Sequence, residues 1–434
     1  MSDSQDTSAM DRPLRAGARK CREAHAAMTS GRYREAVQIA EEGLRLLEGL
    51  PPSEERERLR AALLLERGRA RTMLGEYAAI SDFQTVRQEA PDPSQRSEAL
   101  VGIADCYAGV GDYLAAENAY LQALQEARDL GDSACCIRGW IGLGSVYWKQ
   151  GRIEEAVQTL GQARSALQDL PDVYELGRVL INLGIAYTYS GQLDQAIAAY
   201  EEALDCFRTL QDDHRAAAVL DNLGELHQGI HNLEAALRYH EEARRLAEAA
   251  GADRIQVDVI RNLGVDLFLM GQYSEAMAHL EQALSRAREI GDKDLVLQAL
   301  YSLGDVLLQQ GQVERAMALA SELEAEAEAA QSELHLARAK YLQGRIHLAR
   351  GEKAAARTVL QDALSNAHAL PSRILLWHLH ATLGRATDDP EVARLHFQIA
   401  ADFIRQTVEV LPERPLRTRF LQQPDVQAVL RKGR

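Results

Sequence analysis

Asparagine recurs at one position of a 40-residue pattern. Asn182, Asn222 and Asn262 follow one another at this interval, with Gly142 one interval before them and Ser302 one interval after. Asn is a mediocre helix former, so its presence within helical runs needs another reason. A primary amide donates and accepts hydrogen bonds at once, so it can pair with a peptide group of an extended ligand. Two interpretations follow: the amides form a ladder for a partner's backbone, or each one bonds to a neighbouring helix.

Charged side chains accompany this polar row. Arg138, Arg178 and Asp258 lie four residues before positions of the row, and Glu225 lies three residues after one. These offsets keep side chains on one helix face. An arginine there can bind a partner's carboxylate in a bidentate manner, or it can be solvated or paired within the protein. The predicted partner-binding residues are Arg138, Arg178, Asn182, Asn222, Glu225, Asp258, Asn262 and Ser302.

The remaining reactive residue types do not assemble into a recognisable site. His378 and His380 form an HxH pair, and His227 and His231 are four residues apart. A metal ion needs further ligands, and no Cys or carboxylate pattern supplies them. The glycines form neither a phosphate loop nor a nucleophile elbow. We therefore expect no enzyme activity, no cofactor and no metal.

The candidate residues lie on helices that form pairs. The stretch 178–207 contains a helix, a tight turn at Gly191 and a second helix. Gly184 and Ala196 carry little or no side chain, so the two helix backbones can approach closely. Tyr200 fills the space beside the crossing. Glycine suits the turn because it adopts left-handed backbone geometry without strain.

The pair repeats along the chain. Its turn glycine recurs at positions 31, 75, 111, 151, 191, 271, 311 and 351. His231 takes the remaining slot and is followed by Asn232. Intervals of 44 and 36 residues flank Gly75, so we expect the second repeat to be locally irregular. A period of 40 leaves about 16 to 18 residues for each helix, or roughly 25 Å.

This arrangement resembles the tetratricopeptide repeat family, in which a Trp-Leu-Gly-Tyr helix precedes an Ala-aromatic-Ala helix. Nine units are in register, and a degenerate tenth contains Trp377 and Phe397. The long repeat is similar to the subgroup that includes Pins/LGN-type adaptors, kinesin light chain and bacterial peptide receptors. The resemblance implies an all-α, right-handed solenoid of about nine to ten helix-turn-helix repeats. It also implies that the first helices line a concave surface and that the Asn row faces this groove.

Three segments are expected along the chain. Residues 1–12 form a disordered polar tail, residues 13–410 form the solenoid, and residues 411–434 form a cap. The last segment resembles the end of the repeat tails in bacterial signalling proteins. Leu416 and Phe420 are expected to cover the final hydrophobic face.

Composition and charge exclude several classes of function. The chain has 49 basic and 64 acidic residues, a net charge of −15, and no basic stripe, which argues against nucleic-acid binding. No run of about 18 apolar residues predicts a membrane span. The five cysteines are odd in number and lie in helical segments, which suits reduced thiols and a cytoplasmic location.

Two functions fit these features. The first is a non-catalytic scaffold whose groove binds a peptide or helix of a partner protein, with affinity from contacts over several repeats. The second is a regulatory sensor that responds to a peptide or other ligand and acts on a separate effector protein.

Overall fold

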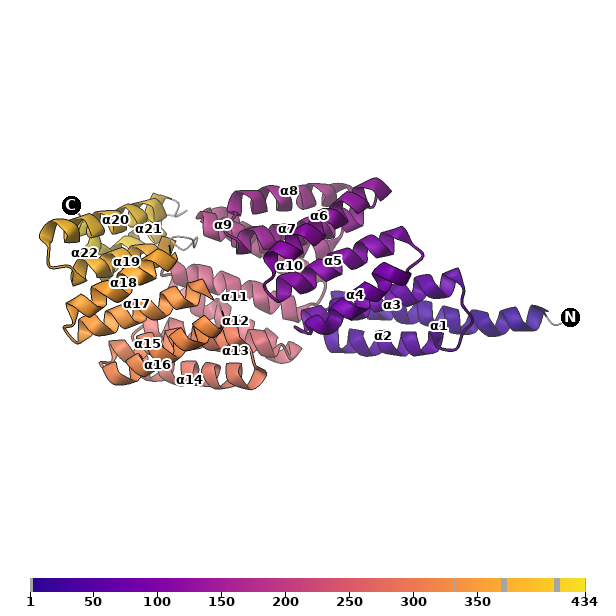
Figure 1. Cartoon of the computed structure of the whole chain (residues 1–434), viewed down its shortest axis with the longest axis horizontal. Helices are drawn as coiled ribbons and strands as arrows, with labels where there is room; N and C mark the ends of the chain where they lie inside the picture. Colours follow the sequence, from indigo (N-terminus) through magenta and orange to yellow (C-terminus); the bar gives the residue numbers. More distant parts are fainter. Residues whose placement is uncertain (1–2, 331, 368–372, 410–413, 434) are drawn as a thin grey trace. The chain divides into compact units, whose positions relative to one another are not determined.

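The computed structural model describes the chain except residues 1–2, 331, 368–372, 410–413 and 434, and this part contains 22 α-helices and no strand (Figure 1). The first helices of the successive pairs are α1 (Asp3–Thr29), α3 (Glu54–Met73), α5 (Pro93–Gly109), α7 (Ser133–Lys149), α9 (Val173–Ser190), α11 (Asp213–Gly229), α13 (Asp253–Leu269), α15 (Lys293–Gln309), α17 (Glu333–Ala349) and α19 (Arg373–Ala386). The second helices are α2 (Tyr33–Leu47), α4 (Ile80–Glu89), α6 (Tyr113–Leu130), α8 (Ile153–Asp169), α10 (Leu193–Thr209), α12 (Leu233–Ala250), α14 (Tyr273–Ile290), α16 (Val313–Ala329), α18 (Lys353–Ala367) and α20 (Pro390–Glu409). The predicted all-α solenoid of helix-turn-helix repeats is confirmed.

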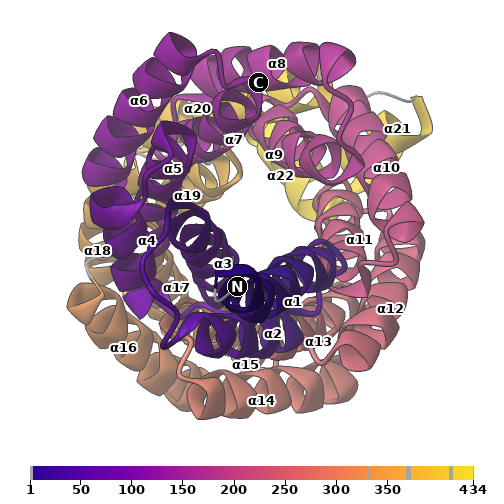
Figure 2. The same ribbon diagram turned by 90° about the vertical axis from the view of Figure 1, so that its right-hand side faces the viewer.

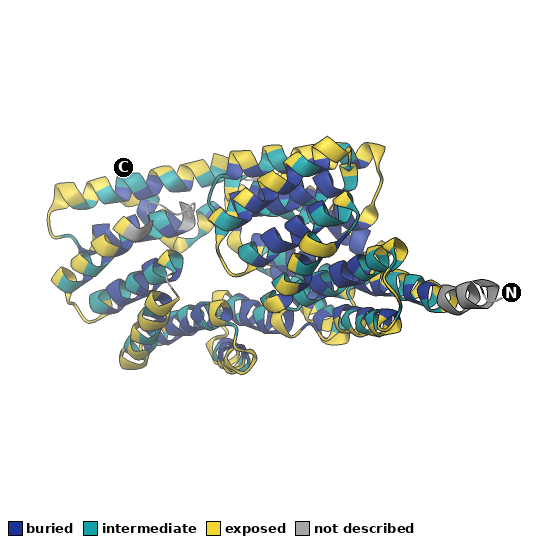
Figure 3. Ribbon diagram, turned by 45° about the vertical axis from the view of Figure 1, so that its right-hand side comes forward, coloured by how far each residue is buried: buried dark blue, intermediate teal, exposed yellow. Residues whose placement is uncertain are grey.

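The chain divides into two compact units. Unit 1 comprises Met1–Ala186 with Ala198–Ala216, and unit 2 comprises Tyr187–Ile197 with Ala217–Arg434. Each has its own core of residues buried where helices face one another (Figure 3).

Small residues set the distance between the helices of a pair. Ala116, Ala156 and Ala196 are fully buried, as their place at the helix crossing predicts. A Cβ on Gly184 would lie 2.5 Å from the ring of Tyr200, closer than real atoms approach. Tyr200 therefore packs directly on the glycine backbone of the preceding helix, and this position accepts no larger residue without movement.

First helices pack on the first helices of the next repeat. In unit 1 α3 contacts α5 and α5 contacts α7, and in unit 2 α13 contacts α15 and α15 contacts α17. Figure 2 shows α13, α15 and α17 on the inner side of α14, α16 and α18. The array of unit 2 thus curves with its first helices inside.

The turns within the repeats use left-handed backbone geometry. Gly271, Gly311 and Gly351 have φ values of 80°, 72° and 79°. His231 occupies the same slot with a φ of 56°, and Gln211 adopts a φ of 56° in a linker between repeats. These two are the only non-glycine residues with positive φ in the described chain, and a side chain makes this geometry costly.

Two turns of unit 1 that are far apart in sequence lie against each other. A Cβ on Gly31 would lie 2.3 Å from Oδ1 of Asp212, so the backbone of the α1–α2 turn touches the α10–α11 linker. The ring of Tyr33 meets the ring of His214 edge to face, with centroids 5.0 Å apart. The start of the solenoid therefore contacts its own later repeats within unit 1.

The N-terminal region differs from expectation. We expected residues 1–12 to be disordered, whereas α1 begins at Asp3. A helix that is already nucleated by packing extends at little cost, because propagation adds one hydrogen bond per residue fixed. The second repeat is irregular as predicted: a 3-10 turn at Tyr77–Ala79 precedes α4, which has only 10 residues.

The C-terminal segment folds onto the last repeat. It contains α21 (Arg414–Gln422) and α22 (Pro424–Lys432), and α22 packs on α20. Phe420 is buried, while the side chain of Leu416 lies outside the described residues. The main apolar contacts come from Val426 and Val429, which are 0% and 1% exposed and which the sequence reasoning did not single out.

Candidate binding face on the first helices

The predicted arginines of unit 1 are held by carboxylates of the same unit. Nη2 of Arg138 on α7 lies 2.9 Å from Oε1 of Glu98 on α5, and Nη1 of Arg178 donates to Glu175 at 2.8 Å. Glu98 also pairs with Arg69 on α3. Burial opposes the charge of Glu175, but Arg178, Arg138 and Arg69 outweigh burial and lower its pKa. The result is a row of paired charges that is only partly exposed.

Asn182 makes two hydrogen bonds within its own unit. Its Oδ1 accepts a hydrogen bond from Nε1 of Trp148 at 3.0 Å, and its Nδ2 donates to the carbonyl oxygen of Arg178 at 2.9 Å. The amide thus joins α7 to α9. One N–H and one oxygen lone pair of the amide remain, while the side chain is held in place by the two bonds.

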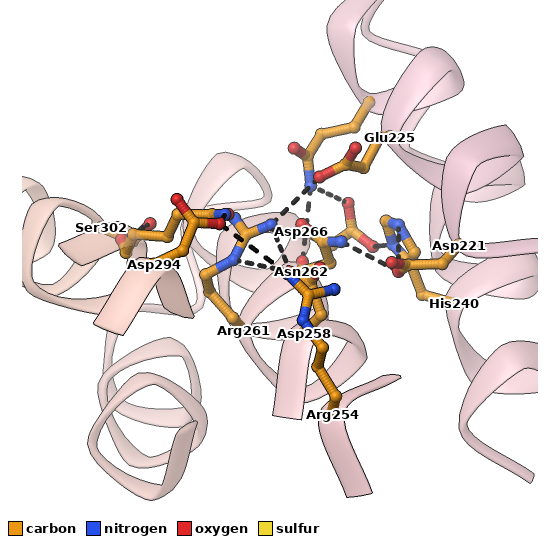
Figure 4. A network of polar contacts seen from close by, with 12 residues as sticks. Asp221, Glu225, His240, Arg254, Asp258, Arg261, Asn262, Asp266, Asp294 and Ser302 are labelled. Atoms are coloured by element: carbon orange, nitrogen blue, oxygen red, sulfur yellow. Dashed lines mark hydrogen bonds and ion pairs between the residues drawn. The ribbon is translucent and has the colours of Figure 1, made fainter. Parts of the chain in front are cut away.

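The unit 2 cluster centres on Arg261, which the sequence reasoning missed (Figure 4). Its Nη2 donates to Glu225 on α11 at 3.0 Å and to Asp258 on its own helix at 2.8 Å. Glu225 remains about half exposed, whereas Arg261 is buried. Arg261 therefore fixes both predicted acidic residues in place and leaves Glu225 accessible.

Asn262 lies beneath this surface. Its side chain is fully buried, and Nδ2 donates to Oδ1 of Asp221 at 2.9 Å. Asp221 also lies 3.8 Å from Nε2 of His240, and Nδ1 of His240 is 2.6 Å from Oδ2 of Asp266. The structure thus places Asn262 in an internal polar network rather than at a surface that a ligand can reach.

Asn222 differs from the other two asparagines. It is half-buried on α11, and among the described residues its amide makes no hydrogen bond. Ser302 also lies partly exposed, but its Oγ donates to the carbonyl oxygen of Gln298 at 3.0 Å. Of the asparagines in the row, Asn222 is the residue whose amide has all of its donors and acceptors left for another molecule.

Ion-pair partners on the first helices lie at regular spacings in the sequence. Glu98 and Arg138 are 40 residues apart, as are Asp305 and Arg345, which also form an ion pair. Complementary charges one repeat apart therefore signal contact between adjacent first helices. Glu175 with Arg178 and Asp258 with Arg261 are pairs three residues apart on one helix.

Within the described residues, no group of three or more His, Cys, Asp or Glu side chains is arranged to hold a metal ion. No described helix is both long and apolar enough to cross a bilayer.

The repeat geometry agrees with sequence comparison. A model of the tetratricopeptide repeat matches residues 95–169, 175–249 and 255–325, and a second model of the same repeat matches residues 337–362. Because these matches cover more than half of the chain, the protein belongs to the tetratricopeptide repeat family. No curated protein matches it.

Solved structures share the fold at low sequence identity. The apo form of the quorum sensor NprR from B. thuringiensis is 13% identical with a TM-score of 0.59, and the match covers 80% of this chain and 97% of that one. The Rap conjugation gene regulator of plasmid pLS20, in complex with the Phr* peptide, is 16% identical with a TM-score of 0.54, covering 92% and 99%. Aspartyl phosphate phosphatase F from Bacillus subtilis is 15% identical with a TM-score of 0.51, covering 95% of each chain.

Proposed function

We propose that this protein is a non-catalytic scaffold that binds a peptide or helix of a partner protein on its first helices. The observation that carries the proposal is the amide of Asn222, which is half-buried on a first helix and makes no hydrogen bond among the described residues, so its donors and acceptors can bind another molecule. Glu225 lies three residues further along α11 and is held in place by Arg261. A peptide group on Asn222 and a basic side chain beside Glu225 would satisfy both.

Two further observations support this proposal. The first helices form the inner side of the curved array in unit 2, and such surfaces in repeat proteins bind extended partners. The Rap regulator with the shared fold was solved with a peptide bound.

Site-specific crosslinking in cells tests the proposal. A photo-reactive amino acid replaces Asn222, and in a control chain it replaces Glu241, which is exposed on the second helix α12. We expect a discrete crosslinked protein or peptide from position 222 and none from position 241. Mass spectrometry then identifies the crosslinked species. Equal crosslinking from both positions, or crosslinking from position 241 alone, would contradict binding on the first helices.

A second candidate function is a sensor that changes conformation on binding a peptide and acts on a separate effector. The shared fold with the quorum sensor NprR and the peptide-bound Rap regulator favours it. Once the crosslinked partner is known, small-angle scattering separates the two functions. A change in the radius of gyration on adding the partner segment favours the sensor, and an unchanged radius favours the scaffold.

A further inference from the structure

A buried histidine replaces an apolar side chain in one repeat. His240 on α12 occupies the position that Tyr200 fills one repeat earlier and Leu280 one repeat later. The residue that faces it from the next first helix, Asp266, corresponds to Leu226 and Val306 in those repeats. An apolar pair has thus been exchanged for a pair that can carry opposite charges.

The exchange produces a closed polar cluster between α11, α12 and α13 (Figure 4). His240 and Asp266 are both fully buried, with Nδ1 and Oδ2 2.6 Å apart. Asp221 lies 3.8 Å from the other ring nitrogen and accepts from Asn262, and Gln228 donates to Oδ1 of Asp266 at 2.9 Å. Two carboxylates therefore flank one imidazole in a site that is largely buried.

We propose that Asp221, His240 and Asp266 form a protonation-dependent joint that holds α11, α12 and α13 together and loosens as the pH rises. A protonated imidazole places a positive charge between two acidic groups, hydrogen-bonded to Asp266 and 3.8 Å from Asp221. Loss of its protons leaves negative charge buried and uncompensated, which is costly in a site of low dielectric.

The surroundings of the cluster set the direction of the effect. The charged groups that face His240 are Asp221 and Glu225 from α11 and Asp266 from α13, with Asp258 and Arg261 of α13 adjoining Asp221.

Folding shifts the pKa values of His240 and Asp221 in the same direction. Burial alone would lower the pKa of His240, but the hydrogen bond to Asp266 and the charges of Asp221, Asp266 and Glu225 outweigh it and raise the pKa. Burial and the charge of Asp258 raise the pKa of Asp221 to about 8. Both pKa values are higher in the folded chain than in the unfolded one. The stabilisation is therefore present at low pH and is lost as the pH rises through the folded values.

Hydrogen exchange of the full chain at pH 6 and pH 8.5 tests the joint. After correction for intrinsic exchange, opening of α11–α13 should rise with pH, by about tenfold per pH unit for each proton released on opening. Opening of α14–α15, where Leu280 and Val306 form an apolar pair, should not. Equal pH dependence in the two regions would overturn the proposal.

Two variants examine the cause. His240→Tyr with Asp266→Leu restores the pair found one repeat earlier and should remove the part of the pH dependence that His240 contributes, leaving that of Asp221. Asp266→Asn keeps the shape of the side chain and removes one charge, so opening should begin at a lower pH. If the double variant does not fold, the Asp266→Asn chain still decides: an unchanged onset of opening rules out the joint.

Discussion

Arg215 donates a hydrogen bond from Nη2 to the hydroxyl oxygen of Tyr174, 2.7 Å away, and its guanidinium also lies over the Tyr174 ring. The same nitrogen lies 3.5 Å from the sulfur of Met73 at the end of α3. Nε of Arg215 is 3.5 Å from Asp212, which is fully buried. One arginine thus links three segments of unit 1.

Replacing Arg215 should destabilise unit 1. Arg215→Ala leaves the Asp212 carboxyl buried without its partner, so we expect a loss of about 3 to 5 kcal/mol in the free energy of unfolding. Urea denaturation followed by circular dichroism measures it. Arg164→Ala is the control, because Arg164 pairs with Glu202 at the surface and should contribute at most about 1 kcal/mol. Equal losses in both variants would contradict the role of Arg215.

Replacing Asn262 should lower the stability of the fold, whereas replacing Asn222 should not. Asn262→Ala removes the amide that donates to buried Asp221, and we expect it to lower the free energy of unfolding by about 1 to 3 kcal/mol. Asn222→Ala removes no internal hydrogen bond and should change stability by less than about 0.5 kcal/mol. Thermal denaturation of the two variants compares them. A larger loss for Asn222→Ala would mean that its amide has an internal role.

The strained turn at His231 offers a stabilising change. His231→Gly relieves a positive φ and should raise the free energy of unfolding by about 1 kcal/mol. Gly271→Ala is the matched opposite change, because its φ is 80° and a Cβ there meets no atom within 4 Å. Gly271→Ala should lower the free energy of unfolding through backbone strain alone. Denaturation midpoints test both, and a destabilised His231→Gly chain would show that the imidazole makes a favourable contact that exceeds the strain.

Acid should loosen the C-terminal repeats. Burial, together with the charges of Arg345 and Arg385, lowers the pKa of His378 to about 3. The folded chain therefore disfavours the protonated ring. The stability that neutral His378 supports is present above its ordinary pKa and declines as the pH falls below about 6.5. Hydrogen exchange of α19 at pH 7 and pH 4.5 should show increased opening at the lower pH, and His378→Phe should suppress the increase.

The cap should fail if its buried face becomes charged. Val426→Asp places a carboxylate in a fully buried position of α22, and we expect α22 to detach from α20 and the chain to self-associate. Gln427→Asp makes the same new charge at an exposed neighbouring position and is the control. Size-exclusion chromatography and hydrogen exchange of α20 provide the measurements. A monomeric Val426→Asp chain with protected α20 would show that α22 does not seal the last repeat.

Local pattern predicted most of the fold. The positions of Gly184, Ala196 and Tyr200 follow from helix periodicity and from the need for close backbone approach, so helix pairs and turns could be placed from spacing alone. The turn at His231 could also be predicted, because His231 takes the place of the turn glycine in the 40-residue repeat. The helical extension of α1 from Asp3 was missed, because polar composition does not exclude a helix that packing elsewhere has already nucleated.

The side-chain partners were harder to predict. Whether Asn262 faces a ligand or Asp221 depends on how α13 packs against α11, which a repeat pattern does not encode. Complementary charges at one-repeat spacing, such as Glu98 with Arg138, were the available signal. The joint at His240 could have been noticed as a departure from the apolar residues found at the same position in other repeats.

The contact of Gly31 with Asp212 limits how this protein can change in evolution. Solenoids ordinarily gain and lose whole repeats, because each unit contacts only its neighbours. Here the α1–α2 turn meets a linker that lies several repeats later in the chain, and only a residue without a side chain fits. Adding or removing a repeat between them would bring a different surface opposite Gly31. A change in the number of repeats between α2 and α10 would therefore cost unit 1 this contact.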